Sequence, residues 1–555
     1  MPTNISKEKR ERLVQKINAI RTYISSVTQD ENTARLLTYI SDIEKDIKGK
    51  KYGLVFEEHR EGIDEVLENN LPVLTEDTDL FIDNGGQMNF LIEGDNLASL
   101  KLLEKTHKGK IALIYIDPPY NTGNKDFVYD DSFVDSNDTF RHSKWLSFME
   151  KRLQIARNLL SEKGVIFISI DDNEQGALKM LCDNVFGENN FISALHWKKK
   201  KQPSFLHGQV AGVMEYILVF SKNRSLVEKI SLESPSDDNT RVDNAANILS
   251  ERSFPAGIRV KLPENITVIK SGIYKNKSMS TEYLNDVYIK HGRTMNPFIA
   301  IARYRDSQER IDMFCDNDVV FITKNYGFRR DKLEEEKNKR KPITDLLLDW
   351  GDNQDSDNEL KYIFGEKRFA YPKPTQLIYN IIKASSSQKT FYILDFFAGS
   401  GTTGHAVMKL NAEDGGNRKF ILCTNNENNI CRDVTYERIK RVIAKEDYKA
   451  SLKYFKVDYL PISDKLYYEY ADELLLHIRE LVELENGINF NGNTEIAIVL
   501  TEKELDDFTK NIPETCKAIY VGHDVLPTEE QEKIFAKNKI KVNVIPEYYY
   551  RDLEG

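Results

Sequence analysis

FYILDFFAGSGTTGHAV, residues 391–407, joins an apolar run to a glycine-rich turn and the start of a helix. Asp395 lies at the end of the apolar run, and the small residues of the turn let the backbone approach a ligand closely. The helix that follows offers free N–H groups at its N-terminus, where anionic groups are attracted. A strand, a glycine turn and a helix in this order predict an α/β sheet with a ligand site beside the turn.

Two kinds of ligand fit this turn, a phosphate or the amino-acid end of S-adenosylmethionine. An ATPase loop requires GxxxxGK[ST], but His405 follows Gly404 where the lysine would stand. Gly399, Gly401 and Gly404 match the dinucleotide spacing G-x-G-x-x-G, which is a weak signal when it stands alone. A packing turn without any ligand is the remaining alternative. The motif has to be judged together with a second one, far away in the chain.

That second motif, LIYIDPPYNTG at residues 113–123, ends a buried apolar strand abruptly at Asp117. Pro118 and Pro119 fix φ and disfavour the helical conformation for the residue before each, so the turn is rigid. In a purely structural interpretation, Asp117 caps a helix and the prolines only stop the strand. The combination Asp-Pro-Pro-Tyr directly after LIYI favours a functional interpretation.

A rigid turn of this kind suits the activation of an exocyclic amine. The N6 nitrogen of adenine is a poor nucleophile because its lone pair is delocalised into the ring. The Asp117 carboxylate and the Pro118 carbonyl can each accept one N6 hydrogen and aim the lone pair at a methyl group. A duplex hides this amine, so the nucleotide has to be flipped out, and Tyr120 is expected to stack on its face. The predicted catalytic residues are Asp117, Pro118, Pro119 and Tyr120.

Two further polar residues are candidates for the cofactor site. Asp95, in IEGDNLASL (92–100), ends the strand before the Asp-Pro-Pro-Tyr strand, where a ligand crossing the carboxyl edge of the sheet would pass. It can equally cap the following helix. Lys373, in FAYPKPTQLI (369–378), lies between two prolines before a helix, where cofactor contact and a solvated lysine in a rigid turn are equal readings. Both alternatives stay open for both residues.

Composition and charge restrict the class of protein. The chain of 555 residues is too long for one core, is 40% hydrophobic and 30% charged, and has no apolar run that spans a bilayer, so no membrane role is expected. A charged N-terminus and five scattered cysteines favour a reducing cytoplasm, and no zinc-site spacing occurs, so no metal is expected. The net charge of -10 argues against bulk electrostatic coating of nucleic acid but allows a local basic groove. One candidate for that groove is the run Lys198 to Lys201, although a solvated surface is an equally good interpretation of it. The other candidates are Arg293, Arg303, Arg305, Arg310, Arg329 and Arg330.

Hydrophobic periodicity divides the chain into five segments. Three- and four-residue spacing near the N-terminus predicts helices that can form a hairpin, and alternating short apolar runs and amphipathic helices predict parallel-sheet units in two separated stretches. The predicted segments are a helical N-terminal segment (1–75), a first core part (76–190), an irregular region read as a target recognition insertion (191–365), a second core part (366–455) and a small αβ domain (456–555).

The two motifs together resemble those of DNA amino-methyltransferases, which share an FxGxG turn and a [DNS]PP[YFW] turn. Because Asp-Pro-Pro-Tyr comes first and an irregular region lies between the motifs, the order resembles the circularly permuted β class. More closely, the chain resembles modification (Mod) subunits of type III restriction-modification systems over most of residues 88–445. This resemblance rests on GDNLASLKLL, IYIDPPYNTG, KWLSFMEKRL, GVIFISIDDNE, EYILVFSKN, YPKP and LDFFAGSGTTGHAV.

The resemblance implies a Rossmann-like class I methyltransferase fold with a mostly parallel seven-stranded sheet. It implies S-adenosylmethionine as cofactor, held by Asp395, Phe396, Ala398, Gly399, Ser400, Gly401 and Thr402. It also implies adenine N6 in double-stranded DNA as the target, a homodimer in which one copy reads the sequence, and a separate restriction (helicase-nuclease) partner. The strand ILCTNNENN lacks the family's usual acidic residue for the ribose hydroxyls, so Asn425 or Glu427 is expected to replace it.

Two other functions remain possible on the residues alone. An N4-cytosine methyltransferase uses the same acceptor geometry, although an aspartate at position 117 favours adenine in the family. A DNA-binding specificity subunit that guides a nuclease needs no catalysis of its own. The chain has neither a Walker A lysine motif nor a nuclease cluster in its sequence, so cleavage is expected to come from another polypeptide.

Overall fold

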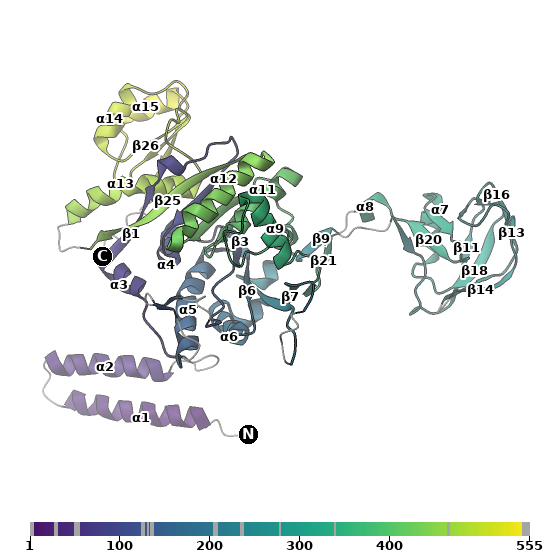
Figure 1. The fold of residues 1–555 in the computed structure, drawn as a ribbon, viewed down its shortest axis with the longest axis horizontal. Coiled ribbons are helices and arrows are strands. Elements are labelled where there is room, and N and C mark those ends of the chain that lie inside the picture. The colour runs from purple at the N-terminus through teal and green to yellow at the C-terminus, as the bar shows by residue number, and fades with distance from the viewer. Residues whose placement is uncertain are drawn as a thin grey trace. The chain divides into compact units, whose positions relative to one another are not determined.

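A computed structural model describes most of the chain, which forms two compact units. Unit 1 comprises residues 1–228, 345–382 and 388–555, and unit 2 comprises residues 229–344 and 383–387. Figure 1 follows the chain from the purple N-terminus to the yellow C-terminus. The described residues are 5–26, 31–48, 56–123, 128–129, 132–133, 138–203, 209–233, 238–276, 279–337, 340–462 and 467–546.

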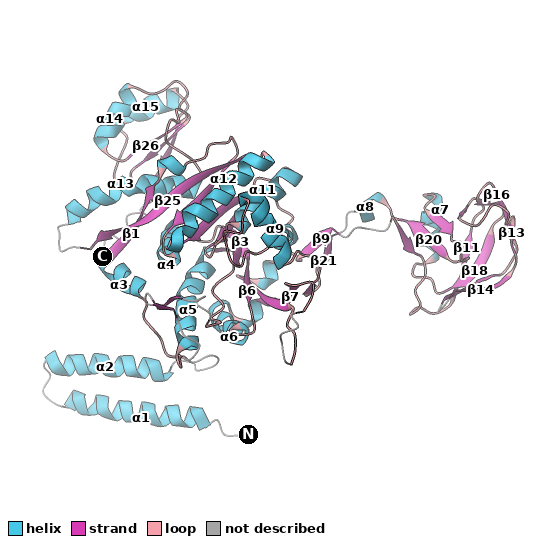
Figure 2. Ribbon diagram, in the orientation of Figure 1, coloured by secondary structure: helices cyan, strands magenta, loops and turns pink. Residues whose placement is uncertain are grey.

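A sheet forms the centre of unit 1 (Figure 2). It is mixed and has ten strands in the order β1-β25-β2-β24-β23-β3-β6-β8-β7-β22. Neighbouring strands are parallel from β25 to β6, whereas β1 and β8 pair in antiparallel fashion with their neighbours. The bounds are β1 Asn70–Glu76, β25 Ala450–Pro461, β2 Gln87–Glu93, β24 Lys419–Thr424, β23 Tyr392–Asp395, β3 Ile111–Ile116, β6 Leu160–Ile170, β8 Met214–Ser221, β7 Phe191–Lys198 and β22 Leu346–Leu347.

The sheet is larger than the seven strands predicted from the sequence, and the predicted boundaries change with it. β1 begins inside the predicted helical segment 1–75 and crosses its end, and β7, β8 and β22 lie inside the predicted recognition region 191–365. β7 and β8 extend the central sheet through hydrogen bonds to β6, so only residues 229–344 separate as an insertion, together with 383–387. The predicted boundary at residues 455 and 456 cuts through β25.

The strands that carry the two motifs are direct neighbours in the sheet. β23, which ends at Asp395, pairs in parallel with β3, which ends immediately before Asp117. β24 and then β2 follow on the other side of β23. Parallel strands end at the same edge of a sheet, so the turns after β2, β3 and β23 meet although the motifs are far apart in the chain.

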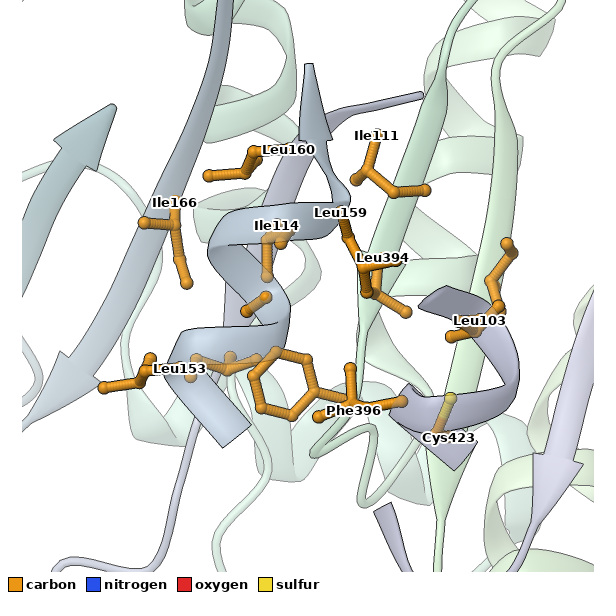
Figure 3. Packing of buried hydrophobic residues seen from close by; sticks show 14 of the residues in the cluster. Leu103, Ile111, Ile114, Leu153, Leu159, Leu160, Ile166, Leu394, Phe396 and Cys423 are labelled. Atoms are coloured by element: carbon orange, nitrogen blue, oxygen red, sulfur yellow. The ribbon is translucent and has the colours of Figure 1, made fainter. Parts of the chain in front are cut away.

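Helices cover both faces of this sheet (Figures 1 and 2). α5 contacts both α4 and α6, and the three helices share a hydrophobic core with alternate strand residues; Figure 3 shows Leu103 and Leu153 from these helices beside Ile114 and Leu394. α11 packs on the opposite face, because Gly404 approaches Leu422 of β24. The bounds are α4 Asn96–His107, α5 Arg141–Leu159, α6 Gln175–Phe186, α9 Asn353–Phe364, α10 Thr375–Ser385, α11 Thr402–Asp414 and α12 Glu437–Glu446.

Short elements occupy the two ends of the chain. The predicted N-terminal helices are α1 (Ile5–Ser26) and α2 (Glu31–Lys48), which contact each other and are joined by an ion pair of 2.7 Å between Arg21 and Glu44; α3 (Gly62–Asn69) follows. Near the C-terminus, α13 (Tyr467–Asn486) packs on the main core, and three strands of the predicted αβ domain form a parallel sheet. That αβ part consists of β26 Ile496–Val499, α14 Glu502–Lys510, β27 Ala518–Val521, α15 Glu529–Lys537 and β28 Lys541–Val544. Among the described helices, none has the length and apolar character needed to cross a membrane.

Unit 2 has a largely β architecture with its own aromatic core. Phe254 stacks on Phe328, with ring centroids 4.4 Å apart, and on Phe298 at 5.1 Å. Its sheets have the orders β10-β20-β19-β12-β17-β16-β13, β11-β18-β15-β14 and β21-β9. The bounds are β9 Ser231–Glu233, β10 Asn239–Arg241, β11 Ser250–Phe254, β12 Arg259–Val260, β13 Val268–Ile269, β14 Gly272–Asn276, β15 Met279–Tyr283, β16 Val287–Lys290, β17 Arg293–Thr294, β18 Phe298–Ala302, α7 Gln308–Asp316, β19 Val320–Ile322, β20 Phe328–Asp331, α8 Glu334–Lys337 and β21 Arg340–Pro342.

Candidate active site

The Asp-Pro-Pro-Tyr turn after β3 is held by side chains from α5 and the start of α6. The buried Trp145 indole donates a hydrogen bond of 2.7 Å to the Pro119 carbonyl. Asn121 has a φ of +55° and donates a hydrogen bond of 2.5 Å to the buried Glu174 carboxylate. A positive φ is uncommon outside glycine, so this side-chain contact stabilises the conformation that the turn requires. The turn therefore presents Asp117 in a fixed orientation.

Four polar side chains meet where β3 ends. The Lys373 ammonium lies 2.8 Å from Oδ1 and 2.9 Å from Oδ2 of Asp117, and donates to the Tyr120 hydroxyl at 2.9 Å. The same hydroxyl lies 2.9 Å from Asp117 Oδ1 and 3.2 Å from Oε2 of Glu215, at the start of β8. Lys199 donates to the other Glu215 oxygen at 3.0 Å. We refer to Asp117, Tyr120, Glu215 and Lys373 as the acceptor cluster.

Burial and ion pairing oppose each other in the acceptor cluster. Burial raises the pKa of Asp117, and the neighbouring Lys373 ammonium offsets this only in part. Burial also acts to raise the pKa of Glu215, but Lys373 and Lys199 outweigh it and hold that pKa below its usual value. Burial acts to lower the pKa of Lys373, yet the two carboxylates keep it above its usual value. At neutral pH, Lys373 is therefore a cation and Glu215 an anion.

The glycine turn is organised around Asp395. Its carboxylate accepts hydrogen bonds from the Phe397 backbone N–H at 3.0 Å and from the Thr403 hydroxyl at 2.5 Å. Gly399 and Gly401 have φ values of +48° and +75°, which residues with a Cβ rarely adopt. The glycines at these two positions therefore let the chain turn sharply from β23 into α11.

A fully buried arginine on α12 supports the same turn. The Arg438 guanidinium donates hydrogen bonds to the hydroxyls of Thr402 at 2.8 Å, Thr375 at 3.0 Å and Ser400 at 3.2 Å. Burial lowers the pKa of Arg438 to about 10, which leaves it charged at neutral pH. Its carboxylate partner is Glu359 at 3.4 Å. The buried Arg438 guanidinium thus holds the glycine turn in place, although no sequence motif around Arg438 indicates this role.

Lys373 joins the two turns. Its side chain belongs to the acceptor cluster, while its backbone carbonyl accepts a hydrogen bond of 3.2 Å from the Thr402 hydroxyl. Asn96, at the start of α4, donates to the Phe396 carbonyl at 3.0 Å, which connects the end of β2 to the glycine turn. These contacts and the β3–β23 pairing bring residues 113–123 and 391–407 together at one edge of the sheet.

The predicted cofactor residues are placed in different ways. Asp95 caps α4 by accepting from the Leu97 N–H at 2.7 Å, and it lies 3.5 Å from the buried Arg152 guanidinium. The Phe396 side chain is fully buried in the core (Figure 3), so only its backbone reaches the edge of the sheet. Lys373 points to the acceptor side. Three residues of the turn are buried: Ala398, Ser400 and Thr402. Two residues after β24 are exposed: Asn425 and Glu427. Their roles towards a cofactor stay predictions.

Most of the predicted groove residues are already paired. Arg303 donates to the carbonyls of Ala245 at 3.0 Å and Asn247 at 2.8 Å, which fixes a loop of unit 2. Other pairs join Lys199 to Glu215, Lys201 to Asp352, Arg293 to Asp318, Arg310 to Asp306 and Arg330 to Glu336. Arg305 is exposed. Over the described part of the chain, no group of three or more His, Cys, Asp or Glu side chains has the arrangement of a metal site.

Sequence reasoning missed Glu215 and Arg438 as site residues. For Glu215 a signal exists, because an acidic residue opens the otherwise apolar strand EYILVF and its side chain is buried. A buried carboxylate in a strand requires a partner, which predicts a polar neighbour on the adjacent turn. For Arg438 the surrounding residues, TYERIKRVI, read as an ordinary amphipathic helix and give no comparable signal.

Comparisons with known proteins show what the chain is similar to. The family model described as DNA methylase matches residues 111–437. The StyLTI Mod subunit, a type III restriction-modification enzyme of Salmonella typhimurium, is 36% identical over 65% of this chain, and the chain spans 58% of that relative's length. The type II methyltransferase M.KpnI of Klebsiella pneumoniae is 33% identical over 60% of this chain and 79% of its own length. The solved PvuII DNA methyltransferase, specific for cytosine N4, covers 67% of this chain and 97% of its own at 13% identity, with a TM-score of only 0.33.

Proposed function

The chain belongs to the DNA methylase family, and we propose that it transfers a methyl group from S-adenosylmethionine to the N6 amine of an adenine flipped out of duplex DNA. The family match includes both turns of the site, residues 117–120 and 396–402. The single observation that carries the proposal is that these turns share one edge of the sheet and are linked through Lys373.

The Asp117 carboxylate and the Pro118 carbonyl are the acceptors in this proposal. Each takes one hydrogen of the target amine, which draws the nitrogen towards sp³ geometry and directs its lone pair. The hydrogen bond from Trp145 to the Pro119 carbonyl supports this role because it fixes the turn without using either acceptor. Tyr120, half-buried beside Asp117, stacks on the flipped base. The nitrogen gains the methyl group and releases one proton, which Asp117 can accept.

The glycine turn fits the cofactor. A Cβ added at Gly399 would lie 3.2 Å from the Phe369 ring, so only a glycine lets the backbone and this ring approach each other closely. The start of α11 offers backbone N–H donors, and Asp95 lies near the turn through its neighbour Asn96. When bound, S-adenosylmethionine supplies an electrophilic methyl group on a sulfonium sulfur. The turn holds its amino-acid end, and Asn425 or Glu427 meets its ribose.

We also propose that the chain is the modification and specificity subunit of a type III restriction-modification system. The similarity to the StyLTI Mod subunit supports this assignment. Unit 2, inserted between β8 and β22, is proposed to read the DNA sequence. Two copies act together, one reading the sequence and the other presenting the catalytic pocket. A separate restriction subunit with helicase and nuclease activities supplies cleavage.

The test compares two variants, Asp117→Ala and Gly399→Val, with the unchanged chain. Each is incubated with radiolabelled S-adenosylmethionine and genomic DNA from cells that lack this protein, and the DNA is then hydrolysed to nucleosides. The unchanged chain is expected to produce N6-methyladenine. Asp117→Ala should lose transfer by about a hundredfold or more, because an acceptor used in the transition state is removed, while cofactor binding by calorimetry persists. Gly399→Val should lose cofactor binding itself.

The possible results separate the candidate functions. N4-methylcytosine in the hydrolysate identifies the cytosine enzyme instead. Full transfer by Asp117→Ala refutes the acceptor role, and unchanged cofactor titration by Gly399→Val refutes the pocket. DNA binding without methyl transfer by the unchanged chain supports a specificity subunit that only guides a nuclease.

A further inference from the structure

The acceptor that the proposed function needs is already occupied. Both carboxylate oxygens of Asp117 lie within 2.9 Å of the Lys373 ammonium, and Oδ1 also faces the Tyr120 hydroxyl. A target amine and an ammonium are both N–H donors, and they require the same oxygens. The Lys373 side chain is only 10% exposed, so the ammonium is not a solvent-facing group that bends away freely. An adenine that reaches Asp117 must therefore displace it to another buried site.

We propose that Lys373 occupies the position of the target amine while no base is bound, and that Glu215 is the positioning residue that receives its ammonium when adenine enters. The inference rests on the proposed function and adds the step by which the acceptor is cleared. Glu215 acts through Lys373 and does not touch the reacting atoms.

Geometry allows this exchange without movement of the backbone. Oε2 of Glu215 already lies 3.5 Å from the Lys373 ammonium, so a small rotation at the end of the lysine side chain completes the contact. The lysine backbone stays fixed, because Pro372 and Pro374 flank it and its carbonyl accepts from Thr402. A flexible stem on a rigid base is suited to moving one charge over a short distance.

Charge balance favours Glu215 as the receiving group. Asp117 and Glu215 carry two negative charges, and Lys373 and Lys199 carry two positive ones. When a neutral amine replaces the ammonium at Asp117, the displaced ammonium keeps a carboxylate partner only if it moves to Glu215. Asp117 then has no cation on its oxygens, which makes it a stronger acceptor for the amine hydrogens. Without a carboxylate at position 215, leaving Asp117 would strand a buried cation.

A double-mutant cycle on methyl transfer tests the proposal. The variants are Glu215→Gln, which keeps the shape but removes the charge, Lys373→Met, and the two combined. Glu215→Gln alone should slow single-turnover transfer by about tenfold or more, because the ammonium stays on Asp117, and cofactor binding should be unchanged. In the Lys373→Met background the same change should cost little, since no ammonium has to be moved. Rates are compared over a range of pH, because loss of the Lys373 ammonium further raises the pKa of Asp117.

Lys179→Met on α6 is the matched control, because Lys179 also pairs with a carboxylate, Asp183, at 2.7 Å but lies outside the acceptor cluster. It should leave transfer unchanged. Equal losses from Glu215→Gln in both backgrounds overturn the inference and assign Glu215 a structural role. Unimpaired transfer by Glu215→Gln overturns it as well. If the unchanged chain transfers no methyl group, the proposed function is refuted and the inference with it. If the unchanged chain is active but Glu215→Gln behaves as just described, only the inference is refuted.

Discussion

Asp395 combines a structural task with an unusual titration. Both of its oxygens accept hydrogen bonds inside the turn, from Phe397 and Thr403. Burial nevertheless raises its pKa from 3.8 to about 7. The native chain therefore binds this proton more tightly than the unfolded chain does. The stability that the group contributes is fully present below about pH 3.8 and is lost as the pH rises through 7.

Asp395→Asn is expected to remove this pH dependence. Asparagine can accept from the Phe397 N–H and donate to the Thr403 hydroxyl, so the turn is retained without a buried charge. The difference in free energy of unfolding, variant minus unchanged chain, should become more positive from acidic to slightly alkaline pH. The change should be about 1.4 kcal/mol for each unit by which the pKa of Asp395 is raised. Urea denaturation at several pH values measures this. The exposed Asp349→Asn is the control, and a parallel trend in both variants contradicts the assignment.

Single residues could be predicted where the chain carries a rigid local motif. Asp117 and Tyr120 follow directly from two prolines after an apolar strand, and the structure brings both to the edge of the sheet. The side-chain contacts around them could not be predicted. Lys373 and Glu215 reach Asp117 from a turn and a strand far away in the sequence, and Lys373 was predicted only as a cofactor contact or a solvated lysine. Only the strand order determines which buried charges become neighbours.

At the level of elements, the packing of α11 depends on Gly404. A Cβ at this position would lie 2.7 Å from Ile439 of α12 and 3.2 Å from Leu422 of β24. Gly404 is also the third glycine of the G-x-G-x-x-G spacing, and its use is close packing of the helix on the sheet. Helix, strand and neighbouring helix therefore approach one another only because no side chain intervenes.

Gly404→Ala is therefore expected to destabilise the protein, by about 1–3 kcal/mol through overpacking, although alanine favours a helix. Gly176→Ala provides the matched control, because Gly176 lies in α6 with no atom within 4 Å of an added Cβ. That variant should be neutral or more stable by up to about 1 kcal/mol. Thermal unfolding of both proteins gives the comparison, and equal shifts contradict the packing argument.

Strands with a strongly apolar sequence were predicted correctly, including β3, β23 and β24. The outer strands of the sheet were not predicted. β7, FISALHWK, is only partly buried and alternates apolar with polar residues weakly, so it resembled the irregular region that follows. β1 contains Pro72 and directly continues from α3. Such strands are specified by their partners in the sheet, and those partners are not visible in local sequence.

On the scale of the whole molecule, a net charge of -10 means that the proposed contact with DNA has to come from a few local cations. In unit 2, Arg303 and Arg305, the neighbours of Tyr304 in the sequence, have different surroundings. Arg303 is committed to the loop carbonyls of Ala245 and Asn247, whereas Arg305 is exposed. The sequence alone marked both as groove residues, because it does not reveal which side chain closes a loop.

The two positions are therefore expected to respond differently to alanine. Arg305→Ala should weaken duplex binding and lower the dependence of log Kd on log salt by about 1, because one phosphate contact is lost. Arg303→Ala should instead lower the free energy of unfolding by about 1 kcal/mol, because the loop carbonyls of Ala245 and Asn247 lose a charged donor. Fluorescence anisotropy with a labelled duplex at several salt concentrations, together with denaturant unfolding, measures both effects. Identical salt slopes for Arg305→Ala and the unchanged chain contradict the contact.

The order of strands in the central sheet also bears on how the protein is made. β2 and β3 are synthesised early, yet β24 and β23 lie between them in the finished sheet. A nascent chain that has left the ribosome as far as β8 therefore exposes strands whose side chains, such as Phe90 and Ile114, are fully buried in the end. Unpaired apolar strands invite aggregation. The exposure ends only when β24, which ends at Thr424, has been synthesised. Production of this protein should accordingly benefit from chaperones and from slow translation at low temperature.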